Sequence, residues 1–264
     1  MNKPEIIFFG NGPLADHALS VLNSHFDIIF HAKTKEDLET VKNLKKSHPS
    51  AHGVLASFGV IIRSDLLDLF EPEGILNVHP SKLPLYRGAS PIESAILNGD
   101  TTFSVSIMKL APAMDAGPIY YQKSIAPDDL TRPDLKSYLY QTLSEAGANW
   151  LINNLENLPT PTPQDDQKAT FTTKFDKSMS QLTPETDTAE QTLRKIQAFQ
   201  GFPKAKYALV GVNCIILAAH PLEQGETALL ALECQDGQIL SIDLLQPEGK
   251  RPMDAKSFLN GYAK

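Results

Sequence analysis

The sequence predicts an α/β protein in which a doubly wound, mainly parallel sheet is followed by a small C-terminal β-barrel of the OB-like kind. Over residues 1–126, short apolar runs alternate with segments of helical spacing, as in successive strand–helix–strand units. After residue 178, short β-rich runs are separated by glycine and polar turns, as in small barrels. The length of 264 residues allows one large domain or two modest ones.

The first half of the chain accounts for the predicted sheet. Six apolar or β-rich runs are expected to form strands, at residues 5–10, 27–32, 52–57, 75–80, 103–110 and 119–125. Helical spacing occurs at residues 14–22, 35–46 and 132–158, and Pro13 suits the first turn of the first helix. In open sheets of this kind, ligands bind beyond the carboxyl ends of the parallel strands.

A change in composition divides the chain. Pro159, Pro161 and Pro163 interrupt the helical pattern, and an extended, proline-spaced segment is typical of a semi-rigid linker. We therefore predict a catalytic domain over residues 1–158, a linker over 159–177 and a β-barrel domain over 178–264. The last begins with a helix near 188–200 and continues with strand-like runs that end in GQILSIDLLQP.

Composition excludes several classes of protein. No run of eighteen apolar residues is present, so no membrane span is expected, and the short apolar run at the N-terminus lacks the features of a signal peptide. We therefore expect a cytoplasmic protein, and a monomer, in which Cys214 and Cys234 stay reduced. The net charge of −7 argues against a protein that coats nucleic acid, although it leaves RNA binding open.

The chemistry is concentrated between residues 74 and 117. Asn77 and His79 lie two apart near the end of a predicted strand, so their side chains share one face. Asp115 follows the next strand in a loop of small residues. An amide, an imidazole and a carboxylate that converge could stabilise an oxyanion, move protons and orient the imidazole, as acyl transfer requires. A histidine at a strand end more often has a structural role, so spacing alone leaves both interpretations open.

Two other motifs resemble ligand-binding patterns. Residues 10–15 fit the G-x-G-x-x-G/A dinucleotide fingerprint, but no acidic residue ends the second predicted strand to bind a ribose, so we interpret Gly10 and Gly12 as a tight turn. His48 and His52 have i,i+4 spacing, but Pro49 breaks any helix between them, and no metal site is expected.

The pattern N-x-H-P-S-x-L-P-x-Y-R-G-A-x-P, from Asn77 to Pro91, followed by D-x-G at Asp115, closely resembles the signature of the 10-formyltetrahydrofolate-dependent formyltransferase family. That family includes methionyl-tRNA, glycinamide ribonucleotide and sugar-amine formyltransferases. The resemblance implies a Rossmann-like, metal-free domain with 10-formyltetrahydrofolate as co-substrate. By the same resemblance, Asn77, His79 and Asp115 match the catalytic residues. The loop that contacts folate is matched by Ser81, Lys82, Leu83 and Pro84.

Segments in the C-terminal part of the chain indicate which members of this family it resembles most. LQPEGKRPMDAKSFLNG (245–261) and TFTTKFDK (170–177) are similar to segments of methionyl-tRNA formyltransferases, which implies initiator methionyl-tRNA as the acceptor. The chain departs from bacterial members after its second predicted strand. There, members carry a longer loop that contacts tRNA, whereas HAKTKED leads directly into a helix. A sugar-amine N-formyltransferase and a formyltetrahydrofolate hydrolase therefore remain as alternatives.

Overall fold

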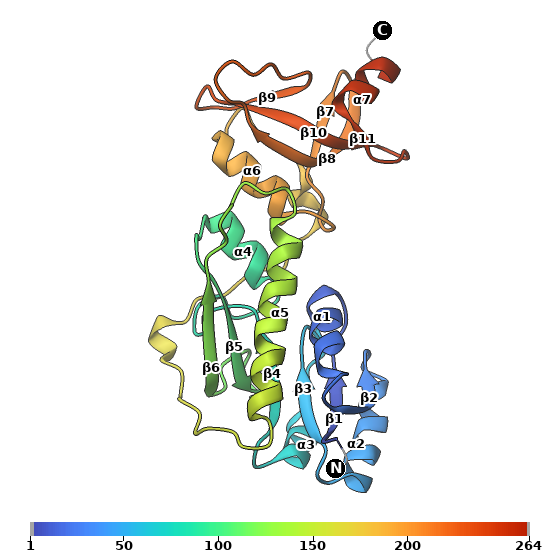
Figure 1. Ribbon diagram of the computed structural model, residues 1–264, viewed down its shortest axis with the longest axis vertical. Coiled ribbons are helices and arrows are strands. Elements are labelled where there is room, and N and C mark those ends of the chain that lie inside the picture. Colours follow the sequence, from blue (N-terminus) through green and yellow to red (C-terminus); the bar gives the residue numbers. More distant parts are fainter. Residues whose placement is uncertain (1–2, 263–264) are drawn as a thin grey trace. The chain divides into compact units, whose positions relative to one another are not determined.

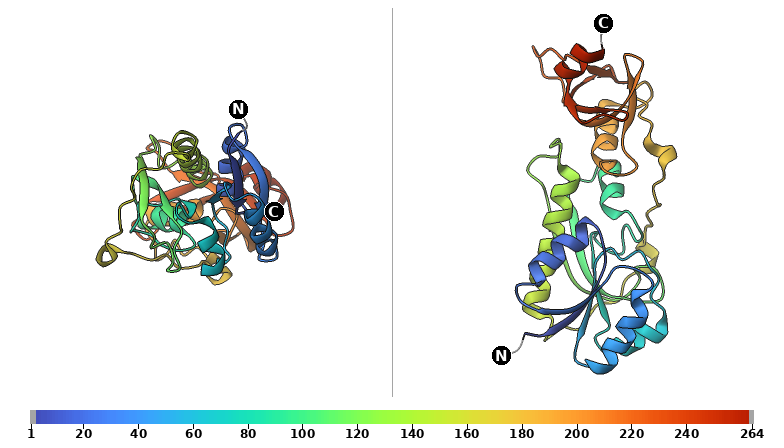
Figure 2. Two further views of the ribbon diagram at one scale, coloured as in Figure 1. Left: turned by 90° about the horizontal axis from the view of Figure 1, so that it is seen from below. Right: turned by 90° about the vertical axis from the view of Figure 1, so that its right-hand side faces the viewer.

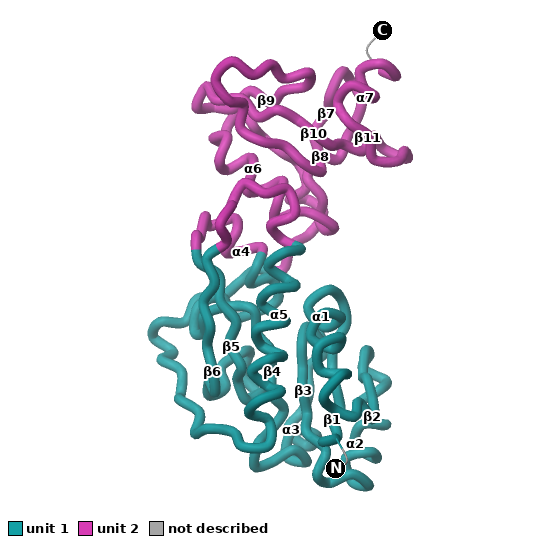
Figure 3. Tube along the Cα trace, viewed as in Figure 1, with its two compact units in different colours: residues 1–92, 102–126, 137–173 teal, residues 93–101, 127–136, 174–264 magenta. Residues whose placement is uncertain are grey.

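The computed structural model describes residues 3–262, which fold into two compact units (Figure 3). Unit 1 contains residues 1–92, 102–126 and 137–173, and unit 2 contains residues 93–101, 127–136 and 174–264. The first unit thus extends to residue 173, inside the segment that the sequence suggested as a linker. None of the helices between residues 3 and 262 has the length and hydrophobicity needed to cross a membrane.

Unit 1 is built on a six-stranded sheet (Figure 1). In spatial order its strands are β2 (Asp27–Ala32), β1 (Glu5–Phe9), β3 (His52–Leu55), β4 (Ile75–His79), β5 (Phe103–Lys109) and β6 (Ile119–Ile125). The first four are parallel, whereas β5 runs antiparallel to β4 and β6 antiparallel to β5. The prediction of a mainly parallel, doubly wound sheet is confirmed.

Helices cover both faces of this sheet (Figure 2). One face carries α1 (Pro13–Leu22) and α5 (Leu135–Asn154), and the other carries α2 (Asp37–Ser47), α3 (Ser64–Leu67) and the 3₁₀ turn η1 (Asp68–Phe70). Ser144 of α5 donates a 3.0 Å hydrogen bond to the carbonyl of Leu14 in α1. A Cβ on Gly147 would come within 2.7 Å of Val78, so this glycine lets α5 lie close over β4.

The centre of the sheet is apolar on both faces because its strands are covered on both sides. The four residues Ile6 to Phe9 of β1 are fully buried. Phe9 makes edge-to-face contacts with Phe58, just after β3, and with Phe70 of η1. Beside it, a Cβ on Gly10 would stand 1.9 Å from the Ala56 carbonyl oxygen, so only glycine fits this turn. These contacts fix the turn at residues 57–59.

The proline-rich segment pairs with unit 1 along most of its length. We call residues 162–172 the strap. Thr162 exchanges two 2.8 Å backbone hydrogen bonds with Ile119 of β6. Farther along, the Arg87 N–H donates to the Thr170 carbonyl at 2.9 Å and the Thr172 N–H donates to the Arg87 carbonyl at 2.8 Å. The strap includes the short 3₁₀ turn η2 (Asp166–Lys168). The segment is extended, as expected, but backbone pairing fixes it against the signature residues.

Unit 2 contains a curled antiparallel sheet. Its elements are α4 (Pro91–Asn98, shared with unit 1), η3 (Lys177–Ser180), α6 (Ala189–Ala198), β7 (Lys206–Leu209), β8 (Val212–Pro221), β9 (Ala231–Glu233), β10 (Ile239–Pro247), β11 (Met253–Asp254) and α7 (Ala255–Tyr262). The strands follow the order β11-β10-β8-β7, with β9 also paired to β10. Register shifts near Leu244 bend β10 against β8, which curls the sheet into a half-barrel. Cys214 and Cys234 are both buried and unpaired.

Candidate active site

The two predicted strand residues lie at the carboxyl end of β4. Asn77 and His79 are 5% and 4% exposed, and their separation by one residue places both side chains on the same face of the sheet. β4 lies between the parallel strand β3 and the antiparallel strand β5, so it is an inner strand of the sheet. Both residues line a cavity of about 400 Å³ that belongs entirely to unit 1.

Asp115 reaches Asn77 and His79 by a loop that reverses the direction of β5. Because β5 is antiparallel to β4, its last residue lies beside Leu76, and the Leu110 N–H donates to the Ile75 carbonyl at the amino end of β4. The loop of residues 110–118, which we call the Asp115 loop, then folds back toward His79. Asp115 has a φ of 48°, in the left-handed region that aspartate tolerates better than most residues. A Cβ on Gly117 would stand 1.8 Å from the Lys109 carbonyl oxygen, so this tight return requires glycine.

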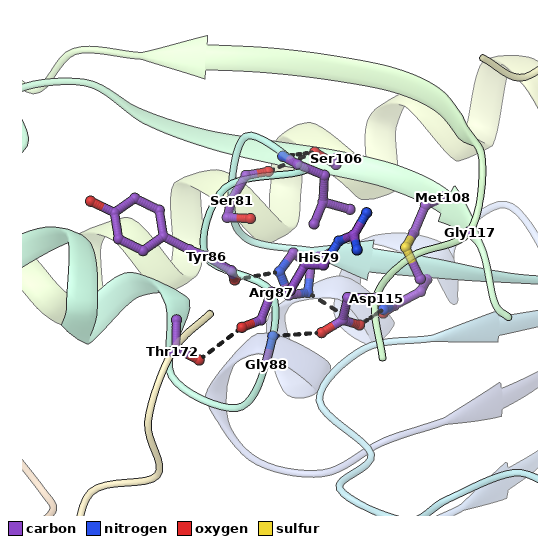
Figure 4. Close-up of polar contacts among 12 residues, drawn as sticks. His79, Ser81, Tyr86, Arg87, Gly88, Ser106, Met108, Asp115, Gly117 and Thr172 are labelled. Carbon is purple, nitrogen blue, oxygen red and sulfur yellow. Dashed lines mark hydrogen bonds and ion pairs between the residues drawn. The ribbon is translucent and has the colours of Figure 1, made fainter. Parts of the chain in front are cut away.

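The Asp115 carboxylate contacts both strand residues, and its approach to His79 is visible in Figure 4. Its Oδ1 lies 3.4 Å from Asn77 Nδ2 and 3.7 Å from His79 Nδ1. Its Oδ2 accepts a 2.8 Å hydrogen bond from the Gly88 N–H. The structure thus brings together the three residues that the sequence singled out, and the backbone of Gly88 holds the carboxylate in place.

The hydrogen bond on the far side of His79 sets its tautomer. His79 Nε2 lies 3.1 Å from the carbonyl oxygen of Tyr86, and a carbonyl can only accept (Figure 4). Nε2 therefore carries the proton when the ring is neutral, and Nδ1, which faces Asp115, has a free lone pair. The imidazole is held ready to take a proton on Nδ1, with a carboxylate 3.7 Å away to balance the positive charge.

The residues expected to contact folate have another visible role. Ser81 donates a 2.7 Å hydrogen bond to the Leu85 carbonyl, and the Ser106 hydroxyl links the Ser81 carbonyl at 2.6 Å to the Leu83 N–H at 3.2 Å. These contacts shape the loop of residues 80–90, which we call the signature loop. Lys82 is exposed, Pro84 is half-buried, and the cavity lining contains none of residues 81–84. Folate contact by these four residues stays a prediction.

The cavity is walled by two loops. The turn after β3 supplies Phe58, Val60 and Ile62 to the lining, and the Asp115 loop supplies Leu110 and Pro112 as well as Asp115 itself. Two further lining residues, Ile61 and Met114, are 86% and 65% exposed. An apolar pocket with a few converging polar groups is typical of a small-molecule site.

The sequence did not reveal three contributors to the site, namely the Tyr86 carbonyl, the Gly88 N–H and Gln164 of the strap. The first two are backbone groups within the signature, where a motif gives no sign of hydrogen bonding. Gln164 donates to the Asp115 carbonyl at 2.8 Å from far along the chain, so no local pattern indicates it. Within residues 3–262, no three His, Cys, Asp or Glu side chains gather as metal ligands would.

Comparison with known proteins places the chain in a family. The sequence matches the formyl transferase family over residues 13–155 and the formyl transferase C-terminal domain over residues 176–263. The methionyl-tRNA formyltransferase of Anaplasma marginale is 34% identical over 219 residues, which are 79% of this chain and 69% of that protein.

Two solved structures share the fold. HypX from Aquifex aeolicus, in complex with tetrahydrofolic acid, matches 100% of this chain with a TM-score of 0.76 at 16% identity. This chain spans about half (48%) of that longer protein. Methionyl-tRNA formyltransferase from Clostridium thermocellum matches 85% of this chain and 95% of its own length, with a TM-score of 0.63 at 18% identity. Together with the sequence matches over both parts of the chain, these findings show that the chain belongs to the formyl transferase family.

Proposed function

We propose that this enzyme transfers the formyl group of 10-formyltetrahydrofolate to the amino group of initiator methionyl-tRNA and releases tetrahydrofolate. The observation that carries the proposal is the arrangement of Asn77, His79 and Asp115 around one cavity, with the lone pair of His79 Nδ1 turned toward the carboxylate. This arrangement supplies a proton acceptor, a counter-charge and a hydrogen-bond donor at one point, as transfer between two nitrogens requires.

His79 transfers a proton from the attacking amine to the folate. An amine attacks a formyl carbon only when it is neutral, and it becomes positively charged as the new C–N bond forms. His79 Nδ1 takes up the proton that the amine loses, and Asp115 stabilises the resulting imidazolium. His79 then returns this proton to N10 of the folate as the old C–N bond breaks. One bond has formed, one has broken and the proton has moved from one nitrogen to the other, so no covalent enzyme intermediate is needed.

Asn77 provides a donor for the developing oxyanion. Its Nδ2 lies 3.4 Å from Asp115 Oδ1, a long contact that leaves the amide able to donate to a reacting oxygen. The protonated ring of His79 adds positive charge beside the same oxygen. A donor that is already oriented in a water-poor pocket stabilises charge without reorganising, which is the largest contribution in many enzymes of this kind.

The cavity fits a folate ring. Its volume of about 400 Å³ lies within the range of small-molecule sites. Phe58, Val60 and Leu110 offer apolar surface to a flat heteroaromatic ring. Exposed Ile61 and Met114 would then be covered by the part of the co-substrate that extends from the cavity.

Unit 2 carries the residues that we propose for binding the tRNA that accepts the formyl group. Lys250 and Arg251 are exposed in the turn between β10 and β11, within the segment that resembles methionyl-tRNA formyltransferases. Cationic side chains in such a turn could contact tRNA phosphates. The connection from β2 to α2 is short, and the side chain of Asp37 closes it by accepting from the N–H groups of Lys33 and Thr34. We therefore assign tRNA binding to unit 2 rather than to this connection.

One assay tests the proposed function. Purified enzyme is given 10-formyltetrahydrofolate with charged initiator tRNA, with an amino-sugar nucleotide or with no acceptor, and tetrahydrofolate release is followed. Turnover that depends on charged tRNA supports the proposal. Faster turnover with the amino sugar would replace it with a sugar-amine N-formyltransferase, and equal turnover without acceptor would replace it with a hydrolase.

We further propose that the enzyme acts as a cytoplasmic monomer, since its tRNA substrate is cytoplasmic and one chain contains all the groups named above. Sedimentation of the purified protein checks the oligomeric state. A stable dimer at micromolar concentration would contradict this part of the proposal.

A further inference from the structure

We propose that Gln164, in the strap, is a positioning residue that sets the orientation of Asp115. This inference rests on the proposed function and extends the site to a residue 49 positions away in the sequence. Gln164 is not among the residues that line the cavity, and it makes no hydrogen bond to His79, so it acts on the site through the two loops that it contacts.

Arg87 fixes which way the Gln164 amide points. The Arg87 guanidinium, of which the side chain is only 5% exposed, donates to Gln164 Oε1 from Nε at 3.0 Å and from Nη2 at 2.7 Å. A guanidinium can only donate, so the amide oxygen must face it. The amide nitrogen is therefore turned the other way, where it donates to the carbonyls of Asp115 at 2.8 Å and Gly117 at 2.7 Å.

These contacts close a ring around the catalytic carboxylate. The backbone of Asp115 is held by Gln164, Gln164 is held by Arg87, and Arg87 is followed by Gly88, of which the N–H donates to Asp115 Oδ2 at 2.8 Å. One side chain thus joins the signature loop to the Asp115 loop. Asp115 has a φ of 48°, which is an uncommon backbone conformation for a residue other than glycine. Without the hydrogen bonds from Gln164, the loop could relax to a more common conformation and turn the carboxylate away from His79.

The same contacts allow two roles to be separated. If Gln164 only anchored the strap to Arg87, a carboxylate in its place would serve as well or better, because it pairs with a guanidinium. If Gln164 positions Asp115, the carboxylate fails. Its second oxygen would face the carbonyl oxygens of Asp115 and Gly117, which are acceptors like itself.

The experiment compares Gln164→Glu, Gln164→Met and a control, Asp166→Ala, in the full-length enzyme. Asp166 also pairs with Arg87, at 2.7 Å, but it is 78% exposed and makes no hydrogen bond to the Asp115 loop. We expect both Gln164 variants to lose about 10- to 100-fold in kcat, since displacement by about 1 Å can cost about 100-fold. The folate KM should change less than about twofold. Asp166→Ala should keep kcat within about twofold of wild type.

A second readout does not depend on activity. The Gly88 amide proton bonds directly to Asp115, so its NMR resonance should move upfield in both Gln164 variants and stay in place in Asp166→Ala. Wild-type kcat and an unchanged Gly88 resonance in Gln164→Glu would overturn the inference. Wild-type enzyme without formyl transfer would instead refute the proposed function, and the Gly88 resonance would still decide whether Gln164 orients Asp115.

Discussion

Replacing Asp115 with asparagine tests the proton step most directly, because it removes the negative charge that is proposed to balance a protonated His79. Asparagine has nearly the same volume, and it tolerates the φ of 48° found at this position. Its oxygen can still accept from the Gly88 N–H, which in the wild type donates a 2.8 Å hydrogen bond to Oδ2. The fold and the Asp115 loop should therefore survive the change.

The distance between His79 and Asp115 determines the loss of kcat that we expect. A protonated His79 lies 3.7 Å from the carboxylate, and both side chains are largely buried, at 5% and 15% exposure. With an effective dielectric constant of about 20, Coulomb's law gives an attraction of about 4 kcal/mol at this distance. Loss of that energy in the transition state corresponds to about a 10³-fold lower kcat. In addition, the new NH₂ group would point toward His79 Nδ1 and occupy the lone pair that should accept the proton.

The assay is steady-state release of tetrahydrofolate with saturating charged tRNA, together with folate affinity measured by calorimetry. We expect kcat to collapse and folate affinity to stay within about threefold. The matched control is Asp65→Asn, which neutralises a carboxylate on the same unit that is 59% exposed and paired with Lys42. Retention of more than a tenth of wild-type kcat by Asp115→Asn would refute the proton step. Equal losses of affinity and turnover would make Asp115 a folate contact instead.

Three further substitutions test other parts of the account. Asn77→Ala removes the proposed oxyanion donor and should lower kcat by about 10²- to 10³-fold at unchanged melting temperature; a variant above half of wild-type turnover would exclude that role. Replacing Lys250 and Arg251 together with alanine should raise KM for charged tRNA and flatten its salt dependence while the folate KM stays the same, and an unchanged salt dependence would place the tRNA contacts elsewhere. Burial lowers the pKa of His52 below 6.5, so the stability from its neutral form is present above pH 6.5 and is lost as the pH falls. The melting temperature of His52→Gln should therefore fall less than that of the wild type when the pH is lowered from 7.5 to 5. Equal falls in melting temperature for the two proteins would contradict this assignment.

The inner strands were predictable because burial on both faces leaves little choice of residue. The apolar run of β1 is fully buried, and its observed end differs from the predicted one by a single residue. The directions of β5 and β6 did not follow from their composition, since parallel and antiparallel strands use the same residue types. The helices α4 and α7 were not predicted. Each has only eight residues, too few to give a clear periodic pattern.

The candidate site also has a part that could be predicted from the sequence and a part that could not. The convergence of Asn77, His79 and Asp115 was predictable because a sequence motif records side chains. The groups that hold them in place are mostly backbone groups, such as the Tyr86 carbonyl and the Gly88 N–H. Such groups are the same in every residue, so their role emerges only from the path of the chain.

The strap also limits where this chain can be cut without loss of contacts in unit 1. A fragment that ended at residue 158 would lose every hydrogen bond that residues 162–172 make with β6 and the signature loop. A cut after residue 173 would keep these bonds, because unit 1 extends to that residue. The joint of an engineered chimaera of this chain should therefore avoid the strap, even though the strap has the composition of a linker.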